Sequence, residues 1–165
     1  MHKGIENVKY AIITVSDSRF NKFISIDDKN EIDDKSGNYL KKELNSTAHI
    51  LIPDNKDMLK GTIDHLIDYF DIDCIVITGG TGISNRDNTT DVLKNLFEKE
   101  LDGFKIIFHT MSYNEIGYAT ILSRSTAGIY RNKIIYAVPG SLNACKTALK
   151  IIKDQTGHIL KHLND

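Results

Sequence analysis

Apolar runs bounded by polar turns alternate along the chain with amphipathic stretches of helical period. This alternation is typical of parallel strands joined by helices, so it predicts an α/β fold: a three-layer, Rossmann-like α/β/α domain with a mostly parallel central sheet. The predicted strands are residues 10–15, 49–52, 74–78 and 104–109, with a hairpin over residues 129–138. The predicted helices are residues 34–45, 56–70, 89–100, 113–124, 143–153 and 156–163.

Two polar segments are predicted to be loops. Residues 20–33 form an acidic stretch, and residues 79–88 follow directly after a predicted strand. In a parallel sheet the carboxyl ends of the strands lie at one edge, and ligands bind there. We therefore expect the functional residues in the turns that follow the strands.

Length and composition limit the possible classes of protein. The 165 residues fit one domain, 1–165, because domains typically run to roughly 100–200 residues. Hydrophobic residues make up 41% of the chain and charged residues 26%, as in an ordinary globular protein. Lys and Arg (21) nearly balance Asp and Glu (22). With so little net charge, we expect neither nucleic acid nor a membrane surface as a partner.

The cysteines and the N-terminal sequence predict a cytoplasmic protein. Cys74 and Cys145 lack the closely spaced partners of a zinc site, so both are expected to be buried, reduced thiols. Residues 1–10 contain no apolar run that would indicate a signal peptide, and no apolar stretch approaches the ~20 residues of a membrane helix. The six histidines are scattered, and His158 and His162 are expected to lie on a solvated helix face.

The segment TGGTGISNRD, residues 78–87, leaves a predicted strand and leads into a predicted helix. Its glycines allow backbone amides to approach an anion closely, and the N-terminus of the next helix adds partial positive charge, so the segment is a candidate phosphate site. It has neither the order of a Walker A loop nor the GxGxxG spacing of a dinucleotide fold. The alternative is a tight glycine turn without a ligand. The candidate residues are Thr78, Gly79, Gly80, Thr81 and Gly82.

Two aspartates are expected beside this loop. Asp87 ends the glycine segment, and Asp54 follows a predicted strand in LIPD. A carboxylate close to a phosphate would repel it unless a cation lies between them, and Mg²⁺ prefers one or two carboxylates plus substrate phosphates. Asp54 and Asp87 are therefore candidate catalytic residues and magnesium ligands. Helix capping is the alternative for both, and also for Asp91, a further candidate in the next helix.

Three other turns carry candidate phosphate-binding residues. They are Ser16 and Asp17 after the first strand, Ser123 and Arg124 at the end of a predicted helix, and Pro139, Gly140 and Ser141 after the last strand. The last of these turns opens a helix and repeats the strand-turn-helix geometry that binds anions. For the first turn the alternative is a solvated turn. For Arg124 the alternative is a cation favoured only by the helix dipole.

Several segments together resemble the MogA/MoaB family of molybdopterin-binding proteins, and its MoaB branch in particular. They are ITVSDSR, DKSG, LIPD, ITGGTGISNRD, SYNEIGYATILSRSTAG and VPGS, which cover most of the chain in family order. The resemblance implies a homo-trimer or hexamer that binds molybdopterin with its terminal phosphate. It also implies that ATP is a substrate, because members similar to MogA transfer AMP from ATP to that phosphate during molybdenum cofactor biosynthesis. Asp54 and Asp87 match the two aspartates that the family needs for this reaction.

The chain departs from the family at a few positions. Asn85 and Asn88 stand where Pro and Val are common, Leu142 follows PGS where Pro is frequent, and residues 20–33 are longer than usual. Two alternatives to the adenylyltransferase stay open: a MoaB-branch carrier that binds molybdopterin without catalysis, and a relative of the competence-damage proteins that acts on a nucleotide diphosphate. We also expect the product to be handed to other cofactor-biosynthesis proteins.

Overall fold

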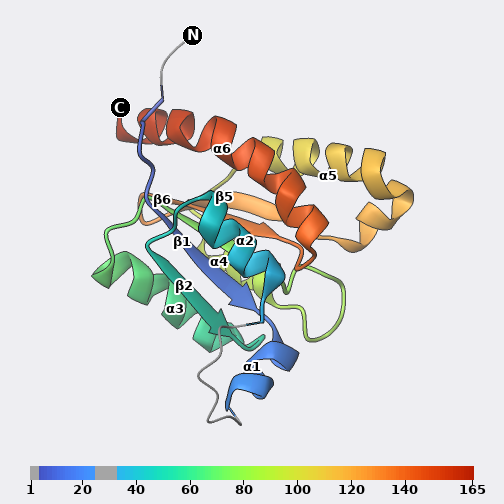
Figure 1. Ribbon diagram of the computed structural model, residues 1–165. Helices are drawn as coiled ribbons and strands as arrows, with labels where there is room; N and C mark the ends of the chain where they lie inside the picture. The colour runs from blue at the N-terminus through green and yellow to red at the C-terminus, as the bar shows by residue number, and fades with distance from the viewer. Residues whose placement is uncertain (1–3, 25–32) are drawn as a thin grey trace.

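A six-stranded sheet forms the centre of residues 4–24 and 33–165, the part of the chain that the computed structural model describes (Figure 1). Its strands are β1 (Tyr10–Val15), β2 (Ala48–Ile52), β3 (Cys74–Thr78), β4 (Lys99–Glu100), β5 (Thr126–Tyr130) and β6 (Lys133–Val138). They lie in the order β2-β1-β3-β6-β5-β4. The first four in this order are parallel, whereas β5 and β4 are added antiparallel. The predicted mostly parallel sheet is confirmed.

Helices cover both faces of the sheet, which confirms the predicted three layers (Figure 1). They are α1 (Asp17–Ile24), α2 (Lys35–Glu43), α3 (Lys56–Tyr69), α4 (Thr89–Leu96), α5 (Asp102–Ile116), the 3-10 helix η1 (Gly117–Leu122) and α6 (Leu142–Asn164). One apolar cluster packs α2, α5 and α6 on one face, and a second packs α3 and α4 on the other. The neighbouring β1 residues Ile12 and Ile13 belong to different clusters. This strand is apolar on both faces because both faces are buried.

Most predicted elements are present near their predicted bounds. β1 and β3 match the prediction, β2 begins one residue earlier, and α2 and α3 lie within the predicted helices. The predicted hairpin is formed by β5 and β6. Its turn contains Arg131 and Asn132, whose φ angles of 47° and 61° lie in the left-handed region that a two-residue hairpin turn requires. Residues 79–88 form the predicted loop.

The predicted strand at residues 104–109 is wrong, because this segment lies inside α5. Phe104 and Phe108 are buried one helical turn apart, whereas Ile106 and Ile107 are 67% and 50% exposed. The continuous apolar run therefore contains a helical period, and periodicity cannot separate such a run from a strand that is buried on both faces.

The predicted helix at residues 113–124 has the wrong bounds. α5 continues to Ile116, and Gly117, with a φ of 66°, ends it. The next residues form η1, which has the tighter 3-10 geometry. This short helix leads the chain back to the sheet at β5.

Two further boundaries differ from the prediction. α4 ends at Leu96, and Lys99 and Glu100 form the short strand β4 instead of continuing the helix. The predicted helices at 143–153 and 156–163 are one helix, α6. Thr156 does not interrupt it, because its buried hydroxyl donates a hydrogen bond to the carbonyl one turn earlier and faces the core.

The predicted loop at residues 20–33 is wrong at its start, because helix α1 extends through residue 24. Asp17 in the first turn of α1 favours this helix through the helix dipole. The rest of the predicted acidic loop, residues 25–32, lies outside the described residues.

A buried polar cluster joins the first two strands to α2. Asp34 is the N-cap of α2 and accepts a hydrogen bond from the Gly37 amide at 3.0 Å. The Thr14 hydroxyl also donates to Asp34, and the Nε2 atom of His49 lies 3.4 Å from the same carboxylate. Gly37 leaves room for this cluster, because a side chain there would collide with all three others. Burial acts to raise the pKa of Asp34, but the hydrogen bonds outweigh it and lower the pKa to about 2.

Replacing Asp34 should reveal this stabilisation and its pH dependence. Asp34→Asn should lower the free energy of unfolding by about 2 kcal/mol at pH 7, because the carboxyl pKa is depressed to about 2 in the folded state. The contribution is present above the unfolded pKa and is lost as pH falls through the folded pKa, so about half should be gone at pH 3. Urea unfolding of both proteins at the two pH values measures this. Equal stability at pH 7 would contradict it.

Candidate functional site

Four turns meet at the edge of the sheet where the parallel strands end (Figure 1). They carry Ser16 and Asp17 after β1, Asp54 after β2, residues 79–88 after β3, and residues 139–141 after β6. The Gly79 amide donates to the Val138 carbonyl at 2.9 Å, and Gly140 packs against the Gly79 backbone, so the last two turns touch. The structure therefore brings candidate residues from distant parts of the sequence to one edge.

The glycine loop, residues 79–88, is fixed by its own glycines and by the helix that follows. Gly79 and Gly80 have φ angles of 103° and 71°, in the left-handed region that glycine adopts without strain. The Thr89 hydroxyl donates to the Gly79 carbonyl at 2.9 Å, and the Thr89 amide donates to the Gly80 carbonyl at 3.0 Å. The N-terminus of α4 consequently lies next to the loop, the arrangement that favours a bound anion.

Asp54 is a buried carboxylate held against the glycine loop. Its Oδ1 atom accepts a hydrogen bond from the Asn88 amide at 3.1 Å. Its Oδ2 atom is so close to Gly80 that a side chain there would approach it to 2.9 Å. Burial raises the pKa of this carboxyl, hydrogen bonds from Asn88 oppose the rise, and the neighbouring charges of Asp87 and Asp17 add to it. A cation beside Asp54 would remove this penalty.

Asp87 lies against the same loop at another glycine. Its Oδ2 atom accepts a hydrogen bond from the Ser84 amide at 3.0 Å and lies where a side chain on Gly82 would approach it to 2.6 Å. The capping alternative is wrong for Asp54 and Asp87, because the N-caps of α3 and α4 are Asn55 and Asn88. Capping therefore accounts for neither carboxylate.

Arg124 holds the glycine loop in place through hydrogen bonds. Its Nη1 and Nη2 atoms donate to the two carboxylate oxygens of Asp91 at 2.8 and 3.0 Å. Its Nε and Nη2 atoms also donate to the carbonyls of Gly82 and Asp87 at 2.9 and 3.0 Å. The guanidinium therefore binds the loop. The alternative from sequence, a cation favoured only by the dipole of the preceding helix, does not describe these contacts. Asp91 and Arg124 are positioning residues that hold the loop on α4.

The turn at residues 139–141 is tied to the core and to α2. The Thr78 hydroxyl donates to the Pro139 carbonyl at 3.0 Å, and the Ser36 hydroxyl donates to the Gly140 carbonyl at 2.7 Å. Ser141 is the N-cap of α6, where its side chain accepts a hydrogen bond from the helix at 3.2 Å. Ser141 is exposed, so the N-terminus of α6 is open to a ligand at this edge.

Three other predicted residues have local partners. Thr81 is buried, and its carbonyl accepts a hydrogen bond from the Arg124 amide at 2.7 Å. The Ser123 hydroxyl lies 2.7 Å from the Ser125 hydroxyl. The Ser16 side chain accepts a hydrogen bond from an amide of α1 at 3.3 Å. These contacts place Thr81 inside the loop and the two serines at its margins.

Arg86 is a site residue that sequence reasoning missed, although the letters SNRD place a cation inside the loop. Its Nε and Nη2 atoms donate to the Oδ2 atom of Asp17 at 2.9 and 2.7 Å. The other oxygen of Asp17 accepts a hydrogen bond from the Asp54 amide at 2.9 Å. Burial acts to raise the pKa of Asp17, but the bonds from Asp54 and Arg86 lower it. Asp17 is therefore an ionised positioning residue, and its charge disfavours the direct phosphate contact expected from sequence.

Both cysteines are buried, as predicted. Burial raises the pKa of the Cys145 thiol to about 11, although the Thr78 hydroxyl, 3.3 Å away, opposes the rise. Burial also raises the pKa of Cys74 well above its usual value. Neither thiol is a nucleophile at neutral pH.

Within residues 4–24 and 33–165, no group of three or more His, Cys, Asp or Glu residues is arranged to hold a metal ion by itself. The Nε2 atoms of His158 and His162 lie 3.0 Å apart on the surface of α6. Such a solvated pair was expected. In the same part of the chain, no helix is long and apolar enough to cross a membrane.

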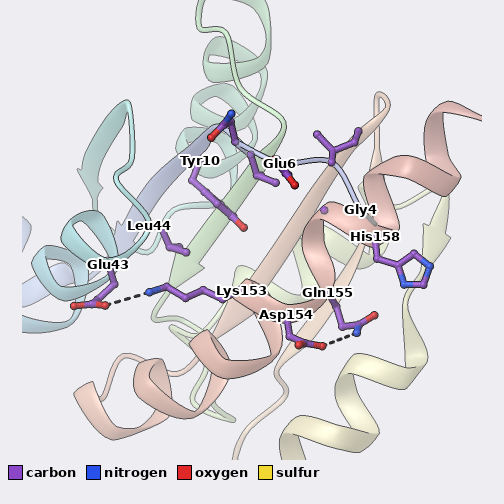
Figure 2. Close-up of a pocket in the computed structure, with 13 residues that line it drawn as sticks. Gly4, Glu6, Tyr10, Glu43, Leu44, Lys153, Asp154, Gln155 and His158 are labelled. Carbon is purple, nitrogen blue, oxygen red and sulfur yellow. Dashed lines mark hydrogen bonds and ion pairs between the residues drawn. The ribbon is translucent and has the colours of Figure 1, made fainter. Parts of the chain in front are cut away.

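A separate cavity of about 650 Å³ lies at the opposite end of the sheet (Figure 2). It is bounded by the N-terminal segment, by Tyr10 at the start of β1, and by α2 and α6. Lys153 and Glu43 form an ion pair of 3.2 Å at this cavity (Figure 2). No residue of the glycine loop lines it. We therefore place the functional site at the edge that holds the loop, where the carboxylates gather.

A family model described as "Probable molybdopterin binding domain" matches residues 11–158, which include all four turns of the site. The chain belongs to the molybdopterin-binding domain family. The resemblance seen in the sequence is therefore confirmed. The family membership also agrees with the position of the glycine loop at the carboxyl end of a parallel sheet.

Relatives in the molybdopterin-binding domain family match the whole chain. The chain is 61% identical over 165 residues to a protein of Methanocaldococcus jannaschii named "Probable molybdopterin adenylyltransferase", covering 100% of this chain and 99% of the relative. It is 42% identical over 170 residues to the "Molybdopterin adenylyltransferase" of Pyrococcus furiosus, covering 95% and 92%. The crystal structure of the tungsten cofactor synthesizing protein MoaB from Pyrococcus furiosus has a TM-score of 0.84 at 40% identity, covering 98% and 99%.

The competence-damage alternative has weaker support. The CinA protein from Thermoplasma acidophilum is 12% identical, with a TM-score of 0.59 and coverage of 92% of this chain and 99% of that chain. A likeness at this level shows a shared fold alone.

Two glycines of the loop should respond differently to substitution. Gly79→Ala should destabilise the protein by about 2 kcal/mol or more, because Gly79 has a positive φ and an added Cβ would lie 2.2 Å from the Val15 carbonyl oxygen. Gly82→Ala should leave stability within about 1 kcal/mol but weaken molybdopterin binding, because the new Cβ, 2.6 Å from the Asp87 carboxylate, narrows the space in which the loop amides would surround a phosphate. Urea unfolding and a titration with molybdopterin measure the two effects. A stable Gly82→Ala protein with undiminished molybdopterin affinity would argue against the loop as the site.

Proposed function

We propose that the protein is a molybdopterin adenylyltransferase of molybdenum cofactor biosynthesis. It binds molybdopterin, transfers AMP from ATP to the terminal phosphate, and releases pyrophosphate. The observation that carries this proposal is Asp54, a buried carboxylate with a raised pKa that lies against the glycine loop beside Asp87. The relatives that match the chain along its whole length are named for this activity.

The phosphate groups bind along the edge formed by the glycine loop and the turn at residues 139–141. Support comes from the two helix N-termini at this edge, those of α4 and α6, whose amides and dipoles favour anions. The two turns touch at Gly79 and Gly140, so both reacting phosphates can bind side by side along them. Thr78, Gly80, Thr81, Gly82, Ser16, Ser123, Pro139 and Ser141 complete the candidate phosphate-binding residues.

Asp54 and Asp87 have the chemistry of a magnesium site. Both present hard carboxylate oxygens at the loop. Burial raises the pKa of Asp54, and the charge of Asp87 adds to the rise. Two protein carboxylates completed by substrate phosphates and water are the ligands that Mg²⁺ prefers. Bound there, magnesium would neutralise charge on the ATP phosphates and on the leaving pyrophosphate. The protein alone does not complete the coordination shell, so we propose that the metal enters with ATP.

The protein acts mainly by positioning the reactants. An oxygen of the molybdopterin phosphate forms a bond to the α-phosphorus of ATP, while the bond from that phosphorus to the bridging oxygen breaks and pyrophosphate departs. No protein nucleophile takes part, which agrees with the inert cysteines. Arg124 and Asp91 keep the loop in place, so the attacking and leaving oxygens stay in line.

The test is ATP-dependent release of pyrophosphate by the purified protein with molybdopterin. Asp54→Asn and Asp87→Asn should each lower the rate at least 100-fold, because each removes a charge that holds the metal. Folding should not suffer in Asp54→Asn. Folding raises the pKa of this carboxyl, so its contribution to protein stability is lost as pH rises through the folded-state pKa. The variant with a neutral amide should therefore be at least as stable as the unmodified protein at pH 7.

Asp102→Asn is the matched control, because Asp102 is an exposed aspartate in α5 that lines no part of the loop. Its rate should equal that of the unmodified protein. Normal rates in both loop variants would contradict the proposed catalytic roles. Tight molybdopterin binding without any binding of Mg-ATP would favour the non-catalytic carrier instead.

We further propose that the protein acts as a homo-trimer or hexamer through the surface of α5 and η1. The large apolar side chains exposed there are Ile106, Ile107, Tyr113, Ile116, Tyr118, Ile121 and Leu122. Several large apolar side chains exposed on two consecutive helices are typical of a protein interface. Residues 1–165 would act as one domain in the cytoplasm and hand the adenylylated product to other cofactor-biosynthesis proteins.

A charge in this patch should dissociate the assembly. Tyr118→Lys and Ile121→Lys each place a cation at a side chain that is 83% and 80% exposed in the isolated chain. Both should elute as folded monomers, with mass measured by light scattering. Tyr69→Lys is the control, because Tyr69 is equally exposed, at 79%, on α3. An unmodified protein that is already monomeric would rule out the proposed interface.

A further inference from the structure

The two arginines beside the glycine loop use their hydrogen-bond donors differently. Arg124 directs Nε, Nη1 and Nη2 to four acceptors, and two of these are the separate oxygens of Asp91. Among the residues that the structure describes, the guanidinium of Arg86 directs Nε and Nη2 to one oxygen, the Oδ2 atom of Asp17, and Nη1 to none. The side chain of Arg86 is also 70% exposed, against 32% for Arg124. Arg86 therefore keeps donors available that Arg124 has already committed.

The ion pair between Arg86 and Asp17 is easily exchanged. Ion pairs between exposed side chains contribute little to stability, because water screens them and the side chains lose conformational freedom. The pair also lacks the two-oxygen geometry that makes arginine-carboxylate pairs strong. A phosphate group offers more oxygens and more charge than one carboxylate oxygen, so it competes well for the same guanidinium.

Arg86 is held next to the proposed catalytic carboxylates. Asp17 accepts the guanidinium on one oxygen and the Asp54 amide on the other, so a single side chain joins Arg86 to Asp54. Arg86 and Asp87 are neighbours in the chain. Asp17, Asp54 and Asp87 bring three negative charges to this end of the site, and Arg86 is an exposed cation placed among them. An ATP triphosphate bound here needs such a cation.

We propose that Arg86 binds the triphosphate of ATP and that Asp17 pairs with the Arg86 guanidinium until the nucleotide binds. On binding, the guanidinium leaves Asp17 and donates to oxygens of the phosphates that will depart as pyrophosphate. Asp17 keeps its hydrogen bond from the Asp54 amide, so the carboxylate for the metal stays in place. This inference rests on the proposed adenylyltransferase function and adds a substrate-binding residue to it.

The test is calorimetric titration with Mg-ATP at low ionic strength, without molybdopterin, so that no turnover occurs. Arg86→Gln should weaken ATP binding about tenfold or more, because a charge-assisted hydrogen bond to phosphate is lost. Arg131→Gln is the matched control, because Arg131 is also an exposed arginine paired with aspartates, but it lies in the β5–β6 turn at the opposite end of the strands from the glycine loop. Its ATP affinity should be unchanged.

Asp17→Asn separates phosphate binding from a purely structural role. Both Arg86→Gln and Asp17→Asn break the same ion pair, and an asparagine oxygen still accepts the Asp54 amide. If Arg86 only held Asp17 in place, both variants would weaken ATP binding by the same factor. If Arg86 binds phosphate, Asp17→Asn should bind ATP at least as tightly as the unmodified protein, because the competing carboxylate is gone.

The outcomes distinguish this inference from the function on which it rests. Unchanged ATP affinity in Arg86→Gln, or equal losses in the two variants, would overturn the role of Arg86. The adenylyltransferase would still stand if Asp54→Asn and Asp87→Asn abolish pyrophosphate release. Failure of the unmodified protein to bind Mg-ATP would overturn both.

Discussion

The burial of a carboxylate beside two others at one edge of the sheet sets the electrostatics of the site. Asp17, Asp54 and Asp87 come from three separate turns. Burial raises the pKa of Asp54, and the charges of Asp87 and Asp17 add to the rise. The chain offsets this penalty in part, with an amide hydrogen bond to each carboxylate and with an arginine on Asp17. The magnesium ion that we propose at this edge would offset the penalty that remains on Asp54.

Two buried aspartates near this edge show how stability and function are divided. Asp34 receives hydrogen bonds from Thr14, Gly37 and His49, and its pKa falls to about 2. Asp54 receives fewer, and its pKa rises. The first carboxylate therefore stabilises the fold, whereas the second is kept poorly neutralised at some expense to stability. Differences of this kind are common where a protein keeps a charged group ready for a ligand.

The sequence was sufficient to predict the parts of the molecule that follow from local pattern. Apolar runs predicted the buried strands. The glycine turn predicted the loop after β3 and, with it, the position of the two aspartates beside that loop. Residues 104–109 were misjudged, since Phe104 and Phe108 are buried while Ile106 is exposed, and hydropathy alone does not show which face is covered. The roles of Arg86 and Arg124 depend on partners 69 and 33 residues away, and no local signal encodes such contacts.

The burial of the two thiols has a consequence for redox chemistry, because the molybdopterin that the family resemblance implies as ligand carries a dithiolate. Cys145 lies beside Thr78, the residue directly before the glycine loop, and burial raises the pKa of the Cys145 thiol to about 11. Cys74 is the first residue of β3 and is also fully buried. A protonated, enclosed thiol neither attacks a sulfur atom nor forms a mixed disulfide. The protein therefore handles two reactive sulfurs without exposing a sulfur of its own that would trap them.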